Sequence, residues 1–363
     1  MKIALSGYYG FDNAGDEALL SAITSTIRKL EPSASFVVFS GYPDNTVRLH
    51  GLRAVNRMNP WSVSREMRSS DLLISGGGSL FQDVTGPRSL PYYISIVALA
   101  LLFKKPVIFY AQGIGPINRR ISKLLMYLIA NRVNMITLRD EDSLKVLQQI
   151  GVTRPPVKVT ADPVFSLEPL DTDYKEMQQL LTQYCPGEGK IIGVSVRQWP
   201  ALKGYQPELA QALDMLVREG YQVIFIPMDF PADIKESQKI AALMKEPSKL
   251  LDRYLTSHQH AALISYLQLM IGMRLHALIF AASQEVLFQG ISYDPKVDSF
   301  LHQFGEKPLK GNAEVMTEQI FSLLASTGKQ EKIRHKAREL RSRAEETAHL
   351  ALSLCRSSSR EVN

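Results

Sequence analysis

The sequence predicts an α/β protein made of two doubly wound domains, each with a parallel sheet. Short apolar runs rich in β-branched residues alternate with amphipathic helical stretches, the pattern of a parallel sheet covered on both faces. The chain has 363 residues, which is too long for one ordinary core and fits two domains. The alternation stops at 162–169, where two prolines fall, and then begins again.

The first series of elements defines a predicted N-terminal domain, residues 1–168. Its strands are expected at 2–6, 35–40, 71–75, 106–111, 135–138 and 157–160. Helical patterns occupy 16–30, 91–104, 119–132 and 141–150 between these strands.

The second series defines a predicted C-terminal domain, residues 169–328, which follows the loop sequence YCPGEGK at 184–190. Its strands are expected at 191–196, 222–227, 267–271 and 286–291. Helices are expected at 207–219, 231–244, 257–265, 276–282 and 312–325. Two such domains facing across a cleft form the GT-B-type architecture, although fold analogy alone says little about chemistry.

The last segment, residues 329–363, is predicted to be a long helix with a frayed tail. Small apolar residues recur along one side of it, at Ile333, Ala337, Leu340, Ala344, Ala348 and Ala351, and basic residues begin the other side. The pattern favours a closing helix packed on the body, with a contact to a membrane surface as the second interpretation.

Bulk composition limits the class of partner. The formal net charge is +6, which favours anionic partners such as phosphorylated substrates, nucleic acid or an acidic membrane surface without choosing among them. Cys185 and Cys355 lie far apart and match no metal or disulfide spacing, which points to a reducing compartment. The longest apolar stretch, 94–103, is about half a membrane span.

Candidate ligand-binding residues follow the strands of the N-terminal domain, because ligands of parallel sheets gather at the carboxyl ends of strands. Asn13 and Asp16 precede the first helix and could cap it or contact a substrate in the cleft. Gly76, Gly77 and Gly78 follow the third strand, where they allow a sharp turn or a close approach of backbone to ligand. The glycines at 7, 10 and 15 do not form the dinucleotide pattern, so a nicotinamide cofactor is poorly supported.

The C-terminal domain places a cation after each of three strands. Arg197, Arg274 and Lys296 follow the strands at 191–196, 267–271 and 286–291, and His276 begins a helix beside them. His276 could be a hydrogen-bonded core residue, but Arg274 would then be buried at the same turn without an anion, which is costly. An anionic ligand would remove that cost. His258 and His260 lack the spacing and the companions of a metal site, so no metal is expected.

Seven motifs together resemble the polysaccharide pyruvyltransferases over residues 3 to about 300. They are GYYGFDNAGDEALL, ISGGGSLFQD, AQGIGP, TLRDEDS, TADPVF, GMRLHALIFA and ISYDPKV. The chain looks most like the bacterial enzymes that pyruvylate N-acetylmannosamine in a lipid-linked cell-wall polymer precursor, the polymer that anchors surface-layer proteins.

The resemblance implies a transferase that uses phosphoenolpyruvate as donor and forms a ketal on two sugar hydroxyls, with no bound cofactor. Arg197, Arg274 and Lys296 would bind the donor, and Arg274 and His276 would act in catalysis. Asn13, Asp16 and the glycines at 76–78 would hold a lipid-diphosphate-linked amino-sugar acceptor. The enzyme would be cytoplasmic and would meet the inner face of the membrane through this acceptor.

Two rival functions stay open at this point. A GT-B glycosyltransferase would also place cations at these strand ends, but an obvious ribose-binding carboxylate is missing from the second half, where Asp294 and Asp298 are the nearby candidates. A non-catalytic module that binds an anionic polymer would need a basic and aromatic surface stripe. The aromatic residues are instead dispersed among the predicted elements, which argues against a nucleic-acid partner.

Overall fold

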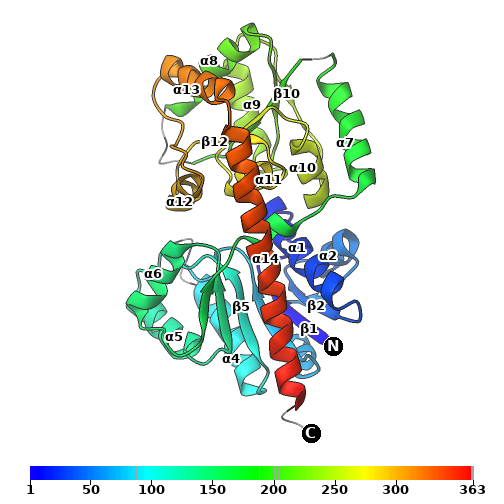
Figure 1. The fold of residues 1–363 in the computed structure, drawn as a ribbon. Helices are drawn as coiled ribbons and strands as arrows, with labels where there is room; N and C mark the ends of the chain where they lie inside the picture. Colours follow the sequence, from blue (N-terminus) through cyan, green and yellow to red (C-terminus); the bar gives the residue numbers. More distant parts are fainter. Residues whose placement is uncertain (85, 87, 188, 200–201, 203, 361–363) are drawn as a thin grey trace. The chain divides into compact units, whose positions relative to one another are not determined.

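The computed structural model describes residues 1–84, 86, 88–187, 189–199, 202 and 204–360, and it divides into two compact units (Figure 1). Unit 1 comprises residues 1–167 and 340–363, and unit 2 comprises residues 168–339. Each unit is an α/β structure on a parallel sheet, which confirms the predicted fold class. Among the described helices, none is both long enough and apolar enough to cross a membrane.

Unit 1 contains a seven-stranded parallel sheet in the order β3-β2-β1-β4-β5-β6-β7. From β1 the chain adds β2 and β3 on one side, and it then returns to place β4 on the other side of β1. The strand order therefore reverses between β1 and β4, as in doubly wound folds. The strands are β1 (Lys2–Ser6), β2 (Ser35–Ser40), β3 (Arg53–Asn56), β4 (Leu72–Gly76), β5 (Val107–Gln112), β6 (Met135–Leu138) and β7 (Val157–Val159).

Alternate residues of these strands point to opposite faces, so the sheet has two apolar cores. One core packs under α3 (Pro60–Arg68), α4 (Ser89–Leu102), α5 (Arg120–Ala130) and α6 (Glu141–Ile150). The other core packs under α1 (Ala14–Leu30) and the end of α14 (Lys329–Arg360). Helix α2 (Pro43–His50) joins β2 to β3, and the 3-10 turn η1 (Pro163–Ser166) packs on α1.

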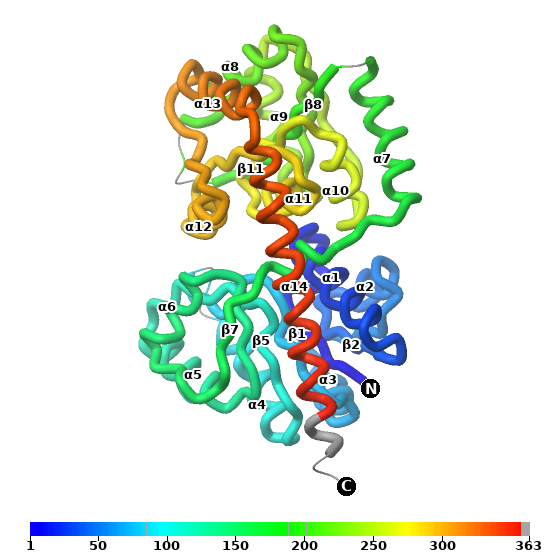
Figure 2. Tube along the Cα trace, viewed as in Figure 1, coloured from blue at the N-terminus to red at the C-terminus, as the bar shows by residue number. Residues whose placement is uncertain are grey.

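Unit 2 contains a five-stranded parallel sheet in the order β10-β9-β8-β11-β12. Its strands are β8 (Ile191–Ser195), β9 (Gln222–Phe225), β10 (Lys249–Leu250), β11 (Leu269–Gly272) and β12 (Leu287–Gly290). The helices are α7 (Asp171–Tyr184), α8 (Tyr205–Arg218), α9 (Ile234–Leu243), α10 (Ser257–Ile264), α11 (Leu275–Ser283), α12 (Pro295–Gln303) and α13 (Ala313–Ala325). Helix α7 packs on α10, and α13 packs on α8 (Figure 2).

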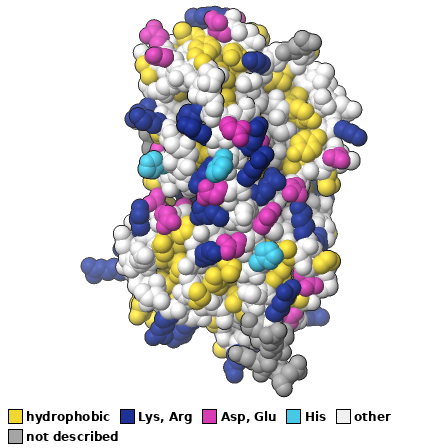
Figure 3. Space-filling model, in the orientation of Figure 1, with side chains coloured by type: hydrophobic (Ala, Val, Ile, Leu, Met, Phe, Trp, Pro, Cys, Tyr) yellow, Lys and Arg dark blue, Asp and Glu magenta, His cyan; other side chains and the backbone are white. Residues whose placement is uncertain are grey.

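The long C-terminal helix α14 starts in unit 2 and ends in unit 1. The small residues of its apolar side, from Ile333 to Ala351, are buried, which supports a closing helix. Its basic side pairs with carboxylates: Arg334 contacts Glu285 and Glu331, and Lys336 contacts Glu339. Figure 3 shows basic and acidic side chains mixed along this helix. The pairing and the buried apolar side favour packing over the membrane interpretation of α14.

The sequence patterns missed several short or polar elements. Strand β3 lies at an edge of the sheet and is only partly buried, so it lacks the apolar run that marked the central strands. Helices α2, α3, α7 and α12 carry polar residues at most positions and bury only a few side chains each.

Candidate functional site

Asn13 caps the first helix of unit 1. Its Oδ1 accepts hydrogen bonds from the backbone N–H groups of Gly15 and Asp16, at 3.1 and 3.3 Å. The capping interpretation is therefore confirmed for this oxygen. The amide nitrogen of Asn13 remains a donor, and the side chain is half-buried at the carboxyl end of β1.

The three glycines after β4 lie against α1 and the loop that precedes it. The Tyr9 hydroxyl donates to the carbonyl of Gly76 at 2.8 Å. Gly77 and Gly78 have φ of 63° and 75°, and a Cβ at Gly78 would lie 3.2 Å from Oδ1 of Asp16. The structure thus brings Asp16 and the glycine turn together at the carboxyl ends of β1 and β4, as the strand order predicts.

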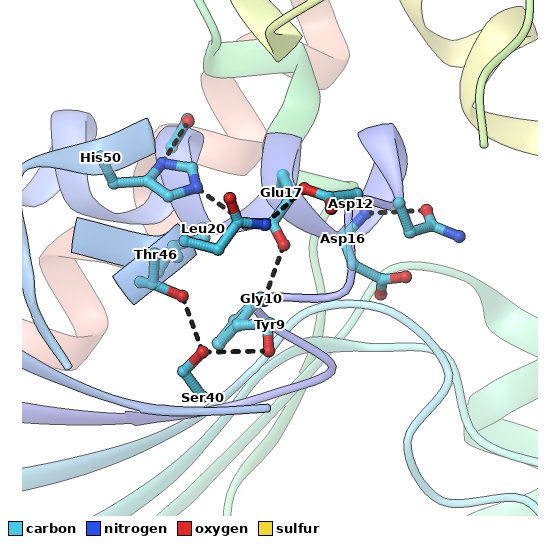
Figure 4. Close-up of polar contacts among 12 residues, drawn as sticks. Tyr9, Gly10, Asp12, Asp16, Glu17, Leu20, Ser40, Thr46 and His50 are labelled. Carbon is cyan, nitrogen blue, oxygen red and sulfur yellow. Dashed lines mark hydrogen bonds and ion pairs between the residues drawn. The ribbon is translucent and has the colours of Figure 1, made fainter. Parts of the chain in front are cut away.

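A buried contact between Glu17 and His50 holds the loop between β1 and α1 (Figure 4). One carboxylate oxygen of Glu17 accepts from the Gly10 N–H at 2.7 Å, and the other lies 2.7 Å from Nε2 of His50. The other ring nitrogen of His50 lies 3.2 Å from the Ser21 hydroxyl. Because Glu17 and Ser21 are buried in α1, this Ser–His–Glu chain fixes the loop and is closed to a substrate.

An aromatic cluster at the same end of the sheet escaped the sequence analysis. Tyr8 stacks on Phe11 with ring centroids 4.2 Å apart, and Phe11 meets the exposed Tyr42 edge-on at 5.8 Å. The guanidinium of Arg57 lies 5.6 Å from the Phe11 ring and 4.1 Å from the Tyr92 ring. Tyr8, Tyr42 and Arg57 each follow a strand closely, which is the signal that could have indicated them.

In unit 2, three neighbouring strands deliver the predicted cations to one edge. Strand β11 pairs with β8 on one side and β12 on the other, so Gly272 lies level with Ser195 and Gly290. Arg197 and Arg274 each follow their strand by two residues, and Lys296 lies in the first turn of α12. The Lys296 ammonium is 3.9 Å from the Asp294 carboxylate.

Arg197 contacts the loop after β12. Its Nη1 donates to the Tyr293 hydroxyl at 3.2 Å, and its guanidinium lies over the rings of Trp199 and Tyr293. Its Nε is buried and has no hydrogen-bond partner within the described residues. A buried guanidinium N–H without an acceptor is costly, so this atom is the clearest mark of an anion site in unit 2.

Arg274 has carboxylate partners inside the chain, which corrects the sequence argument that it would lack an anion. Its Nε and Nη2 donate to the buried carboxylate of Asp233 at 3.0 and 2.6 Å, and Nη2 also donates to Asp229 at 3.0 Å. Burial alone would lower the pKa of Arg274, but the hydrogen bonds and charge of Asp233 raise it overall, with a smaller contribution from Tyr293.

His276 begins α11 two residues after Arg274, and its ring is half-buried with Nε2 shielded from solvent. His260, by contrast, is buried with its ring nitrogens 3.1 Å from the carbonyls of Thr256 and Pro227. Within the residues that the structure describes, no group of three or more His, Cys, Asp or Glu side chains could hold a metal ion.

The fold resembles those of proteins solved with UDP-sugars bound. Over 97% of this chain and 99% of the other, it matches UDP-GlcNAc 2-epimerase from Neisseria meningitidis bound to UDP-GlcNAc, with a TM-score of 0.66 and 13% identity. Anabaena Alr3699/HepE in complex with UDP-glucose gives a TM-score of 0.64 at 13% identity, over 99% of this chain and all of the other. These similarities define the class, a GT-B-type α/β protein.

The family follows from the sequence. Residues 13–295 match the pattern of the polysaccharide pyruvyl transferases, and the chain belongs to that family of transferases. The matched range contains Asn13, Arg197, Arg274 and His276. The amylovoran biosynthesis protein AmsJ of Erwinia amylovora is 23% identical over 362 residues, covering 84% of this chain and 86% of AmsJ.

Replacing Gly77 with alanine should destabilise unit 1 more than the same change at Gly51. Both glycines have φ of 63°, where an alanine costs about 1–2 kcal/mol. A Cβ at Gly77 would also lie 2.9 Å from Leu19, whereas a Cβ at Gly51 would meet no atom within 4 Å. The extra overpacking should add about 1–3 kcal/mol, measured by urea unfolding. Equal losses for Gly77→Ala and Gly51→Ala would show that the glycine turn does not pack tightly on α1.

Removing the carboxylate of Asp233 should destabilise unit 2 strongly, because Arg274 would be left as a buried charge. We expect Asp233→Ala to lower the free energy of unfolding by about 3–5 kcal/mol. Asp229→Ala is the matched control, since the Asp229 side chain is more exposed and its loss should change stability by about 1 kcal/mol or less. Urea unfolding followed by circular dichroism measures both, and a small effect at Asp233 would contradict the pair's structural role.

Proposed function

We propose that this transferase moves a pyruvyl group from phosphoenolpyruvate to two hydroxyls of a sugar, forming a ketal and releasing phosphate. The acceptor we propose is N-acetylmannosamine in a lipid-linked cell-wall glycan precursor. Family membership supports pyruvyl transfer to a polysaccharide. The observation that carries the donor assignment is the buried, unmatched Nε of Arg197 at the carboxyl ends of β8, β11 and β12.

The donor carries a phosphate and a carboxylate, and arginine can bind either group with two parallel hydrogen bonds. Arg197 is the principal candidate, because the described part of the chain gives it no carboxylate partner. Arg274 uses Nε and Nη2 for the two aspartates, so its Nη1 is the donor left for a ligand. Lys296 would add a third positive charge from the first turn of α12.

The proposed reaction moves a proton at each step. A proton adds to the methylene carbon, one sugar hydroxyl adds to C2, phosphate leaves, and the second hydroxyl adds as the ketal closes. A group that accepts and returns protons near neutrality accelerates such steps roughly 10²–10⁴-fold. His276 is the imidazole nearest in sequence to the cations, and Arg274 beside it would stabilise charge on the departing phosphate.

The acceptor would bind in unit 1. The Asn13 amide nitrogen and the Asp16 carboxylate offer a donor and acceptors for sugar hydroxyls. Gly76, Gly77 and Gly78 would let the sugar approach this turn closely, because they have no side chains, while their carbonyls are bonded within the chain. The cluster of Tyr8, Phe11 and Tyr42 adds flat apolar faces at the same end of the sheet, which suit the apolar side of a sugar ring. Arg57 would supply a cation for a diphosphate.

A nucleotide-sugar glycosyltransferase is the second candidate, because proteins of similar fold are solved with UDP-glucose or UDP-GlcNAc bound. Calorimetric titration with phosphoenolpyruvate and with UDP-sugars separates the two. Tight binding of a UDP-sugar with no binding of phosphoenolpyruvate would end the pyruvyl transfer proposal.

Arg197→Ala should weaken phosphoenolpyruvate binding at least tenfold, because the guanidinium offers charge and paired donors together. Arg197→Lys keeps the charge without the fork and should recover only part of the affinity. Titration calorimetry measures both dissociation constants. Lys249→Ala, which removes an exposed cation from the edge strand β10, is the control. Unchanged affinity in Arg197→Ala would remove this residue from the donor site.

His276→Ala should lower kcat by about 10²–10⁴ and leave the affinity for phosphoenolpyruvate nearly unchanged, because the imidazole is assigned to proton transfer. Phosphate release in the presence of donor and sugar acceptor gives kcat. His302→Ala, at an exposed position of α12, should keep full activity. If His276→Ala instead unfolds, as shown by a lost thermal transition, the histidine is a core residue.

A further inference from the structure

One side of helix α5 presents apolar side chains to solvent. Ile121, Leu124 and Leu128 are 66%, 55% and 43% exposed, and with the half-buried Leu125 they recur at helical spacing along one stripe. Ser122, Met126 and Ala130 form the buried side of the same helix. A surface helix ordinarily exposes polar residues. Helix α5 departs from this pattern, because it has one apolar side that is buried and a second apolar side that faces solvent.

The neighbouring helices extend this surface. Helix α4 packs beside α5, contains no charged residue, and ends at Leu102, which is 74% exposed. Helix α3 packs on α4, and its Trp61 is 86% exposed. An open hollow lies between α3 and the end of α4. It is lined by Trp61, Ser64, Arg65, Arg68, Ser69 and Phe103. Exposed apolar side chains thus occur on three helices that pack in series, and groups of such side chains mark interaction sites.

The charges around this surface are almost all positive. Residues 84–139 contain eight Lys or Arg and no Asp or Glu, in a chain whose totals are 42 and 36. Arg119, Arg120 and Lys123 are exposed at the start of α5, and Lys104 and Arg132 are exposed beyond the ends of α4 and α5. Glu66 on α3 is buried and paired with Lys2 and Arg53. The acids on the border include Glu141 and Asp142 of α6 and Asp71 after α3; Asp142 pairs with Lys145, and Asp71 accepts from the backbone nitrogen of Lys2.

We infer that the α3–α4–α5 surface of unit 1 docks onto a membrane that contains anionic lipid. Apolar side chains flanked by cations match the interfacial layer of such a bilayer, where acyl chains lie just below negative headgroups. A second copy of this chain fits less well, because a symmetric contact would place the same cations opposite one another. The inference does not depend on pyruvyl transfer, although a lipid-linked acceptor would reach unit 1 from such a surface.

The test is flotation of the full chain with vesicles of phosphatidylcholine alone or mixed with phosphatidylglycerol. We expect binding to the mixed vesicles, weakened by salt, and little binding to phosphatidylcholine. The variant Ile121→Gln/Leu124→Gln/Leu128→Gln should lose at least about tenfold in affinity, since its apolar stripe is gone. The matched control, Leu170→Gln/Leu243→Gln/Val315→Gln, changes three similarly exposed apolar residues of unit 2 and should bind normally.

A second pair of variants tests the charge. Arg120→Gln/Lys123→Gln should weaken binding roughly tenfold or more, because each cation near an anionic surface contributes about fivefold. Lys235→Gln/Lys310→Gln removes the same charge from exposed positions of unit 2 and should have a much smaller effect. Unchanged thermal transitions establish that all four variants are folded.

Three results would overturn the inference. The first is that the unmodified chain does not bind anionic vesicles, and the second is that the variants and their controls lose equal affinity for them. The third is that the chain forms a dimer, without binding vesicles, and the α5 variant abolishes that dimer. The last result would assign the surface to a second copy. Phosphate release with a water-soluble sugar acceptor should be unaffected in the α5 variants, so failure of the docking inference and failure of the proposed activity give different results.

Discussion

The buried pair of Arg274 and Asp233 is the interaction on which the proposed donor site depends. It joins the turn after β11 to the start of α9, and Asp233 also accepts from the backbone N–H groups of Met228 and Asp229 after β9. One carboxylate thus fixes two strand ends. The same turn carries His276, and the neighbouring strand β8 leads to Arg197, which donates to the Tyr293 hydroxyl after β12. An imidazole on a turn fixed in this way would need little reorganisation to serve in the proposed proton transfers.

In unit 1, too, buried charged side chains hold the turns after the strands, with different residues. Glu17 holds Gly10 and His50, while Arg139 after β6 donates to Ser79 beside the glycine turn and to Asp162. In both units a buried charge spans neighbouring strand ends and leaves the backbone there in a fixed shape. The groups proposed to meet substrates, such as the Asn13 amide and the aromatic cluster, lie on these fixed turns.

The central strands and the longer helices could be predicted from the sequence, because burial on both faces makes continuous apolar runs and one-sided burial makes a helical period. Strand β3 could not, since Ala54 and Val55 stand alone between the exposed Arg53 and Asn56 at a solvated edge. The three cations at one edge could be predicted from strand order. The partner of Arg274 could not, because Asp233 lies 41 residues away at the start of an ordinary helix. Likewise, a stack such as Tyr8 on Phe11 depends on loop conformation, which periodicity does not encode.

Helix α14 has a consequence for how the chain is made. Residues 340–356 cover the sheet face of unit 1 that includes Ile108 and Tyr110, yet they are synthesised after all of unit 2. During translation this apolar face therefore remains uncovered by α14 until all of unit 2 has been synthesised. A fragment cut after residue 167 would keep that face bare permanently, and we regard such a fragment as prone to aggregate. Unit 1 therefore depends on the completed synthesis of unit 2 for the helix that covers this face.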